Sequence, residues 1–188
     1  MDAIEALRSR YSGRALQEPA PSGAALEIIL ESASRAPDHG RLRPWRFILI
    51  EREQRAAFGD LLAAQAQRMR PGSTPEALER ERQKAFRAPL IIVVAAIPNP
   101  EAKIPPIEQI LAAGAAAQNI MLASFAQGFN AMWKTGDAAY DEEVKRAFGL
   151  APQDSIVGFL YLGTDSAEPP ALTRPSWRER TQTWNPVT

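Results

Sequence analysis

The stretch that most constrains the fold is residues 106–129, PIEQILAAGAAAQNIMLASFAQGF, which consists almost entirely of helix formers. No proline follows Pro106 in it, and apolar or small residues occupy every side of the helix that it predicts. A helix that is apolar all round belongs in an interior. At 1.5 Å per residue this helix spans roughly 30 Å, the width of a small domain. We therefore predict a long central helix, buried within a domain or at an interface between two subunits.

The alternative interpretation of this stretch is a membrane span. A span needs about 20 strongly apolar residues. Here most of the apolar content is alanine, and Gln118 and Asn119 place two amides in the middle of the helix. Buried amides need hydrogen-bond partners, which the backbone, a second subunit or a bound ligand would supply. We therefore expect a buried helix and no membrane as partner.

Composition excludes several classes of function. The 188 residues carry 22 basic and 22 acidic side chains, which disfavours nucleic acid or an anionic membrane as the main partner. Cysteine is absent and His39 is the single histidine, so we expect neither disulfide chemistry nor a multi-histidine metal site within one chain. Electron transfer would therefore need a bound cofactor. The charged start, where a signal peptide needs an apolar run, predicts a cytoplasmic protein.

The rest of the chain alternates predicted helices with short β-branched runs. Strands are predicted at residues 45–51, 90–97 and 155–162, and residues 130–134 predict a further strand or a loop. The continuous run LIIVVAAI at 90–97 is typical of a central strand covered on both faces. This pattern predicts an α+β sandwich, in which helices surround a mixed sheet of about four or five strands. We expect one domain over residues 1–164 and a tail, 165–188, that wraps over the body or over a partner subunit.

Three stretches carry residues suited to ligand binding, and each also has an ordinary structural interpretation. Residues 10–14, RYSGR, place two guanidinium groups and a hydroxyl in one turn, which suits phosphate, although arginine is common at helix ends. Residues 35–45 form a proline-bounded loop that contains His39, which is either a surface histidine or part of a site. Residues 131–136, AMWKTG, end in a turn whose backbone N–H groups can face a ligand. The GxGxxG and GxxxxGK[ST] nucleotide fingerprints are absent.

Taken in order, these stretches resemble the FMN-dependent nitroreductase family, and most closely its short bacterial NAD(P)H nitroreductases. The family pattern is present as the Arg-x-Ser-x-Arg turn at 10–14, the loop leading into Pro-Trp at 36–45, and the Ala-rich helix at 107–129. The segments FRAPLIIVVAA at 86–96 and IVGFLYLGT at 156–164 match the short members. The resemblance covers roughly residues 1–164.

The resemblance implies a homodimer with two FMN sites at the subunit interface, to which the central helix contributes. The FMN contacts implied on one subunit are Arg10, Tyr11, Ser12, Arg14, Met132, Trp133, Lys134, Thr135 and Gly136. The other subunit would contribute Arg35 and His39. A contact with NADH or NADPH is implied at Met121, Leu122, Ala123, Ser124, Phe125 and Ala126. Neither a catalytic side chain nor a metal is implied, because the flavin carries the chemistry.

Within that set, the resemblance implies that Arg10 and Ser12 hold the phosphate or ribityl chain of FMN. Arg14 would lie near the ribityl chain or the pyrimidine edge, where a cation favours reduction of the flavin. The Thr135–Gly136 backbone would donate a hydrogen bond to N5. Two departures alter polar recognition of the flavin, since residues 38–41 read DHGR in place of the family's Ser/Asn loop and Arg43 replaces its glutamine. Further candidates for the phosphate are Arg174, Arg178 and Arg180.

The function implied is that of an FMN-dependent NAD(P)H oxidoreductase. It would reduce small-molecule acceptors, nitroaromatics or quinones, by a ping-pong hydride transfer. The acceptor pocket would be bordered by residues 65–86 and 104–108. Two alternatives stay open: the same fold with another flavin reaction, such as dehydrogenation, dehalogenation or flavin destruction, and a flavin-binding dimer without turnover.

Overall fold

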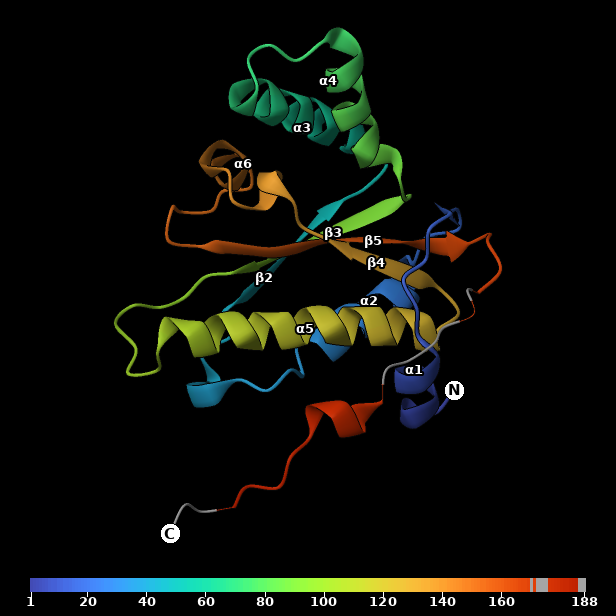
Figure 1. Cartoon of the computed structure of the whole chain (residues 1–188), viewed down its shortest axis with the longest axis vertical. Helices are drawn as coiled ribbons and strands as arrows, with labels where there is room; N and C mark the ends of the chain where they lie inside the picture. The colour runs from blue at the N-terminus through green and yellow to red at the C-terminus, as the bar shows by residue number, and fades with distance from the viewer. Residues whose placement is uncertain (170, 172–175, 186–188) are drawn as a thin grey trace.

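One five-stranded sheet with helices on both faces makes up the body of the protein (Figure 1). The computed structural model describes residues 1–169, 171 and 176–185. The strands are β1 (Leu16–Gln17), β2 (Trp45–Ile50), β3 (Leu90–Ala96), β4 (Asn130–Lys134) and β5 (Ser155–Asp165). The helices are α1 (Ala3–Ser9), α2 (Gly23–Ala33), α3 (Arg55–Met69), α4 (Pro75–Arg82), α5 (Pro106–Ala126) and α6 (Glu142–Ala147). Short 3-10 turns are η1 (His39–Arg41), η2 (Gln83–Phe86), η3 (Asp137–Ala139) and η4 (Trp177–Arg180). The predicted α+β fold is confirmed.

The sheet is antiparallel where a mixed sheet was expected. Strand β3 lies between β2 and β5, and β5 also pairs with β4 and β1, always in the antiparallel sense. The helices α3 and α4 form a hairpin that returns the chain to the end of the sheet where β2 stops, so β3 runs opposite to β2. The parallel pairing found among the described residues is an isolated bridge between Ser12 and Ala131.

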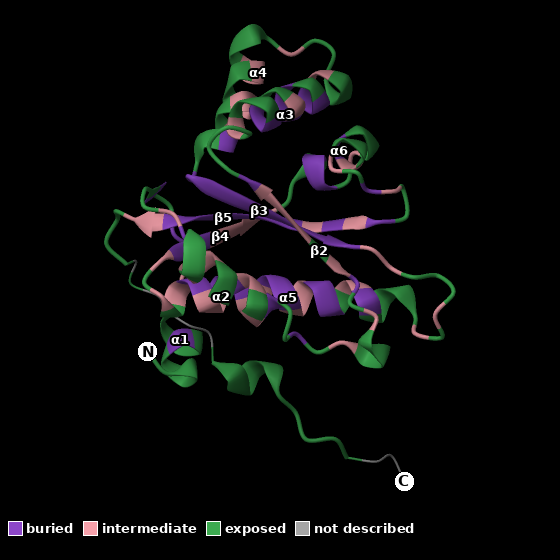
Figure 2. Ribbon diagram, turned by 180° about the vertical axis from the view of Figure 1, so that it is seen from behind, coloured by how far each residue is buried: buried purple, intermediate pink, exposed green. Residues whose placement is uncertain are grey.

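Each face of the sheet has its own apolar core, because successive strand side chains point to opposite faces. On one face, Leu160 and Leu162 of β5 pack with α2 and α5. On the other face, Phe159 and Tyr161 pack beneath α3, η2 and α6. Strand β3 is buried along its whole length, as predicted for a central strand covered on both faces (Figure 2).

The long helix α5 spans the sheet, and within the single chain one of its faces is exposed, which leaves open the predicted burial at an interface between two subunits. Side chains such as Ile120 pack on the strands, and Asn119 donates to the Ser32 carbonyl of α2 at 3.0 Å. On its outer side, Ile107 is 59% and Leu111 is 64% exposed. By length and composition alone α5 could cross a membrane, yet 44% of its most apolar window is buried inside the fold. Its packing is that of a core helix with one open face.

Other boundaries differ from the predicted ones by a turn or less. Residues 22–36 predict a helix that Pro37 ends, whereas α2 already ends at Ala33. Residues 75–86 predict one charged helix, whereas the structure divides this segment into α4 and η2. Strand β5 continues to Asp165, where it pairs with β1, a two-residue strand too short to give a sequence pattern.

The described part of the tail lies outside both cores. Trp177 is 64% and Trp184 is 81% exposed. The Arg178 guanidinium lies 4.7 Å from the centre of the Trp177 ring. Figure 1 shows this segment running away from the sheet beyond α5. Wrapping of the tail over a partner subunit therefore stays a prediction.

Candidate active site

The turn at residues 10–14 is tied to strand β4 by hydrogen bonds. The Gly13 N–H donates to Asn130 Oδ1 at 3.0 Å and to the Ala131 carbonyl at 3.3 Å. Asn130 is only 4% exposed, so this amide serves as an internal anchor. A Cβ on Gly13 would lie 2.7 Å from a methyl carbon of Leu16, and this close approach requires glycine. The turn is thus fixed against the start of β4.

Strand β4 carries most of the third predicted stretch, residues 131–136, and it is also held by close contacts. The Trp133 indole N–H donates to the Val157 carbonyl on β5 at 3.2 Å. The ring lies so close to Gly158 that a Cβ there would be 2.2 Å from the indole nitrogen. Beyond the strand, Gly136 has φ +77°, a left-handed conformation that glycine adopts without strain. This residue turns the chain into η3.

Two adjoining cavities lie over this end of the sheet, and together we call them the cationic cleft. The first, about 360 Å³, is lined by Phe58, Leu62, Gln65, Arg70, Glu81, Lys84, Arg87, Trp133, Lys134, Thr135, Gly136, Asp137, Ala138, Phe159 and Tyr161. The second, about 410 Å³, is lined by Gly13, Arg14, Ala15, Leu16, Arg87, Met132, Lys134 and Tyr161. Three residues are common to both: Arg87, Lys134 and Tyr161.

Basic side chains predominate in the cleft. Five cationic residues line it, Arg14, Arg70, Lys84, Arg87 and Lys134, against the two acids Glu81 and Asp137. Glu81 is paired with Lys84 one helical turn away. The remaining cations give the cleft a positive field, which attracts an anionic ligand such as a phosphate ester.

The floor of the cleft is apolar and aromatic, with one phenol. Phe159 and Tyr161 alternate on β5 and so share the face beneath α3. Burial raises the pKa of Tyr161 to about 12, against a smaller lowering effect of Arg87. The phenol therefore keeps its proton at neutral pH and remains a hydrogen-bond donor. A flat aromatic ligand fits such a floor.

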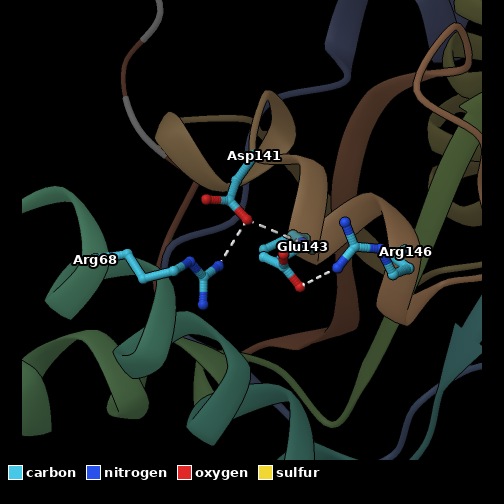
Figure 3. Close-up of polar contacts among 5 residues, drawn as sticks. Arg68, Asp141, Glu143 and Arg146 are labelled. Carbon is cyan, nitrogen blue, oxygen red and sulfur yellow. Dashed lines mark hydrogen bonds and ion pairs between the residues drawn. The ribbon is translucent and has the colours of Figure 1, made fainter.

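An ion pair fixes the helix that forms the wall of the cleft. Arg68, in the last turn of α3, lies 2.7 Å from Asp141, whose carboxylate also accepts the Val144 N–H at the start of α6 (Figure 3). The Asp141 side chain is 13% exposed. This contact links α3 to α6, next to η3.

The structure brings the first and third predicted stretches together. Arg14, Met132 and Lys134 line the second cavity. Trp133, Lys134, Thr135 and Gly136 line the first. Arg10 caps the C-terminal end of α1, Ser12 forms the bridge to β4, and the Tyr11 ring packs edge-on against Phe125 at 6.0 Å.

Arg35 and His39 lie elsewhere in the single chain. Arg35 lines a separate open cavity of about 970 Å³, together with Arg41 and Arg43. His39 is exposed, and its Nδ1 lies 2.7 Å from Glu108 in the first turn of α5. Neither residue lines the cationic cleft, so a role for them at the same ligand requires a second subunit.

The predicted dinucleotide segment is only partly accessible in the single chain, and its contact with NADH or NADPH stays a prediction. Met121 is 3% exposed and Ser124 is fully buried, because their side chains pack inside the protomer. Leu122, Ala123 and Ala126 line a surface cavity of about 470 Å³ between α1 and α5. The exposed positions of this segment are therefore the ones open to a dinucleotide, whereas the side chains of Met121 and Ser124 face the interior of the protomer.

The sequence did not single out Arg87 and Tyr161, which line the cleft, or Asn130, which anchors the turn at Gly13. Gln65 and Lys84 were included only as members of the segment 65–86. Tyr161 was detectable, because strand alternation places it on the same face as Phe159. The segment 65–86 borders the cleft as expected. Residues 104–108 lie instead near η1, where Ile104 contacts Gly40. Of the tail arginines, Arg174 lies outside the described residues, whereas Arg178 and Arg180 are exposed.

Comparison with known proteins gives this site a family context. The Nitroreductase family matches residues 7–164. The chain is 44% identical over 164 residues to "Putative NAD(P)H nitroreductase YdjA" of Escherichia coli, covering 87% of this chain and 88% of that protein.

Solved structures agree with this match. A nitroreductase-like family protein of Bacillus cereus superposes with a TM-score of 0.81 at 25% identity, covering 98% of this chain and 96% of the other. A nitroreductase of Desulfovibrio desulfuricans in complex with FMN superposes with a TM-score of 0.73 at 26% identity, covering 99% of both chains. The matched family segment contains the turn at 10–14, strand β4 and the cleft walls, and the chain therefore belongs to the nitroreductase family.

Proposed function

We propose that the protein is an FMN-dependent NAD(P)H oxidoreductase that reduces nitroaromatic or quinone-like acceptors. The observation that carries this proposal is the cationic cleft, in which the turn at 10–14 and the end of β4 meet in a chain of the nitroreductase family. The relatives named for NAD(P)H and the related structure solved with FMN support the same cofactor pair here.

The residues of the cleft fit FMN in charge and in shape. Arg14, Arg87 and Lys134 offer cations for the phosphate and for the electron-rich edge of the ring. Trp133, Phe159 and Tyr161 offer a flat aromatic floor. From the turn at 10–14, Gly13 and Arg14 line the second cavity, whereas Arg10 and Ser12 line neither cavity, and their contact with the phosphate or ribityl chain stays part of the proposal. Thr135 and Gly136 line the first cavity, and we propose that their backbone donates the hydrogen bond to N5.

FMN, when bound, supplies the two-electron chemistry that connects NADH or NADPH with the oxidised acceptor. The chain itself needs no nucleophile for this reaction. Its cations stabilise the negative charge that accompanies reduction, and the buried walls restrict water. One open face has to receive both reactants, so the reductant leaves before the acceptor enters, which is a ping-pong order.

We further propose that the protein works as a homodimer. Ile107 and Leu111 expose large apolar side chains along one face of α5, and burial of such side chains favours association. Arg35 and His39 lie outside the cationic cleft of their own chain, and pairing along α5 would bring them to the cleft of the partner. Residues 165–188 would extend over that partner.

Spectroscopy and kinetics of the purified protein test this proposal. We expect FMN to bind, NADPH or NADH to bleach it, and initial rates with a nitroaromatic and a quinone to give parallel double-reciprocal plots. Full turnover by a protein that has been verified to be flavin-free would contradict the proposal. Bound flavin that neither nucleotide reduces would favour the alternative of a binding dimer without turnover.

The dimer has its own test. Leu111→Arg places a charge on the exposed face of α5 without disturbing either core, because Leu111 is 64% exposed. We expect this variant to be monomeric by light scattering, to remain folded by circular dichroism, and to bind FMN more weakly. A dimeric variant with unchanged FMN binding would contradict the proposed interface.

A further inference from the structure

A buried amide on α3 has no structural role that the described residues account for. Gln65 is only 5% exposed and lies on the face of α3 that also carries Phe58 and Leu62. Its Nε2 is enclosed, and it forms no hydrogen bond within residues 1–169, 171 and 176–185. Buried polar atoms in native proteins nearly always have a partner, so this atom requires an explanation.

The position carries a cost that an apolar residue would avoid. A buried donor without an acceptor destabilises a protein by about 1–3 kcal/mol. Met or Leu, which favour helices as much as Gln does, would fill the same space without that cost. The folded chain alone therefore gains nothing from an amide here. A ligand that supplies the missing acceptor would account for it.

Gln65 faces the first cavity of the cationic cleft, whose other polar groups are mostly donors. Its wall includes the basic side chains Arg70, Lys84, Arg87 and Lys134, as well as the protonated phenol of Tyr161. Its two acids are Asp137 and Glu81, and the carboxylate of Glu81 is already engaged by Lys84. An occupant that satisfies these donors has to present acceptor oxygens, and the aromatic floor requires it to be flat.

We propose that Gln65 is a ligand-binding residue, which donates through Nε2 to an uncharged oxygen on a planar ring held in the first cavity. This inference rests on the proposed function, because both candidate oxygens belong to that reaction. One is a ring carbonyl of FMN, and the other is the nitro or quinone oxygen of the acceptor. In both cases the Gln65 amide donates one hydrogen bond to an oxygen of the bound ring.

The helix holds this amide in a fixed direction. Gln65 lies one turn before Arg68, whose pairing with Asp141 at 2.7 Å links α3 to α6. Around it Leu62 and Ala66 are buried, which leaves the side chain little rotational freedom. A donor fixed before the ligand arrives loses less entropy on binding than a mobile one.

The test compares Gln65→Met with Gln67→Met, measuring the unfolding midpoint of the apoprotein, the dissociation constant of FMN and the KM for a nitroaromatic. Gln65→Met should raise the midpoint, because it removes the unpaired amide. It should also raise either the FMN dissociation constant or the KM about fivefold to tenfold, as expected for one hydrogen bond. Gln65→Leu repeats the test with a second apolar shape.

The control position is on the same helix but outside the cleft. Gln67 is half-buried and donates to the Pro71 carbonyl at 2.7 Å. Its replacement should lower the midpoint and leave FMN binding and the KM unchanged. The unfolding midpoint is therefore expected to rise for Gln65→Met and to fall for Gln67→Met.

The measurements distinguish a flavin oxygen from an acceptor oxygen as the partner of Gln65. They also distinguish failure of the Gln65 inference from failure of the proposed function. A higher FMN dissociation constant assigns the oxygen to the flavin, whereas a higher KM with unchanged FMN binding assigns it to the acceptor. A lower midpoint for Gln65→Met and Gln65→Leu, or unchanged binding and KM in both, overturns the inference alone. Wild-type protein that takes up no FMN overturns the proposed function as well.

Discussion

Replacing Asn130 by alanine should weaken both the fold and the binding of FMN. Its Oδ1 accepts the Gly13 N–H at 3.0 Å and the Ala131 N–H at 2.7 Å, and the side chain is 4% exposed. Gly13 keeps a longer bond of 3.3 Å to the Ala131 carbonyl, so the loss there is partial. The two lost bonds together should lower the free energy of unfolding by about 2–3 kcal/mol. For a chain of this length that corresponds to a fall in Tm of about 4–12 °C.

The effect on FMN follows from the turn that Asn130 holds. A looser turn has to be ordered by the ligand, and each kcal/mol of that cost weakens binding about fivefold. Denaturant unfolding with an unchanged slope measures the stability, and a fluorescence titration of the apoprotein measures the affinity.

Asn119→Ala is the matched control for this change. Asn119 donates to the Ser32 carbonyl at 3.0 Å and holds α5 to α2, outside the cationic cleft. It should lower stability and leave FMN binding unchanged. Equal losses of FMN affinity in the two variants, or unchanged affinity and stability in Asn130→Ala, would refute the assignment of Asn130 as the anchor of the turn.

Three further changes test individual contacts. Because burial raises the pKa of Tyr161 to about 12, its phenol ionises first in the unfolded chain, so the wild type should lose stability between pH 10 and 12. Tyr161→Phe should lack this loss, and equal alkaline slopes would contradict the argument. Gly158→Ala should displace Trp133, whose indole nitrogen would lie 2.2 Å from the new Cβ. Its unfolding free energy should fall by about 1–3 kcal/mol and its near-ultraviolet circular dichroism should change, whereas an unchanged spectrum would be contrary to expectation. Arg68→Ala should cost less than about 1 kcal/mol by denaturant unfolding, because the pair with Asp141 is partly exposed, and a larger loss would mean that it does more than link α3 to α6.

Most of the fold could be predicted, because its elements leave strong local patterns. The apolar run at 90–97 and the alanine-rich run at 106–129 correspond to β3 and α5, since burial and helix propensity both act locally. The antiparallel order of the sheet was not predicted, because strand direction depends on where the intervening helices return the chain. The sequence could not decide whether each apolar side chain of α5 lies in the core or at an interface, because apolar residues occur in both places.

The site was predictable only where its residues are neighbours in sequence. The turn at 10–14 and the end of β4 each form a short motif, and the structure places both at one cleft. Gln65 and Arg87 carry no local pattern, because their role depends on how α3 and η2 pack over the sheet. The hydrogen bond from Gly13 to Asn130 joins residues 117 positions apart, so no local sequence pattern could predict it. Burial of Met121 and Ser124 depends on which side of α5 meets the strands.

The most direct test of the central claim is the visible absorption spectrum of the purified protein during anaerobic addition of NADPH and then NADH. The account predicts flavin bands, present after purification or after addition of FMN, that bleach with at least one nucleotide and return when a quinone is added. A colourless protein that fails to take up FMN would contradict it, because the cationic cleft would then have no flavin to hold.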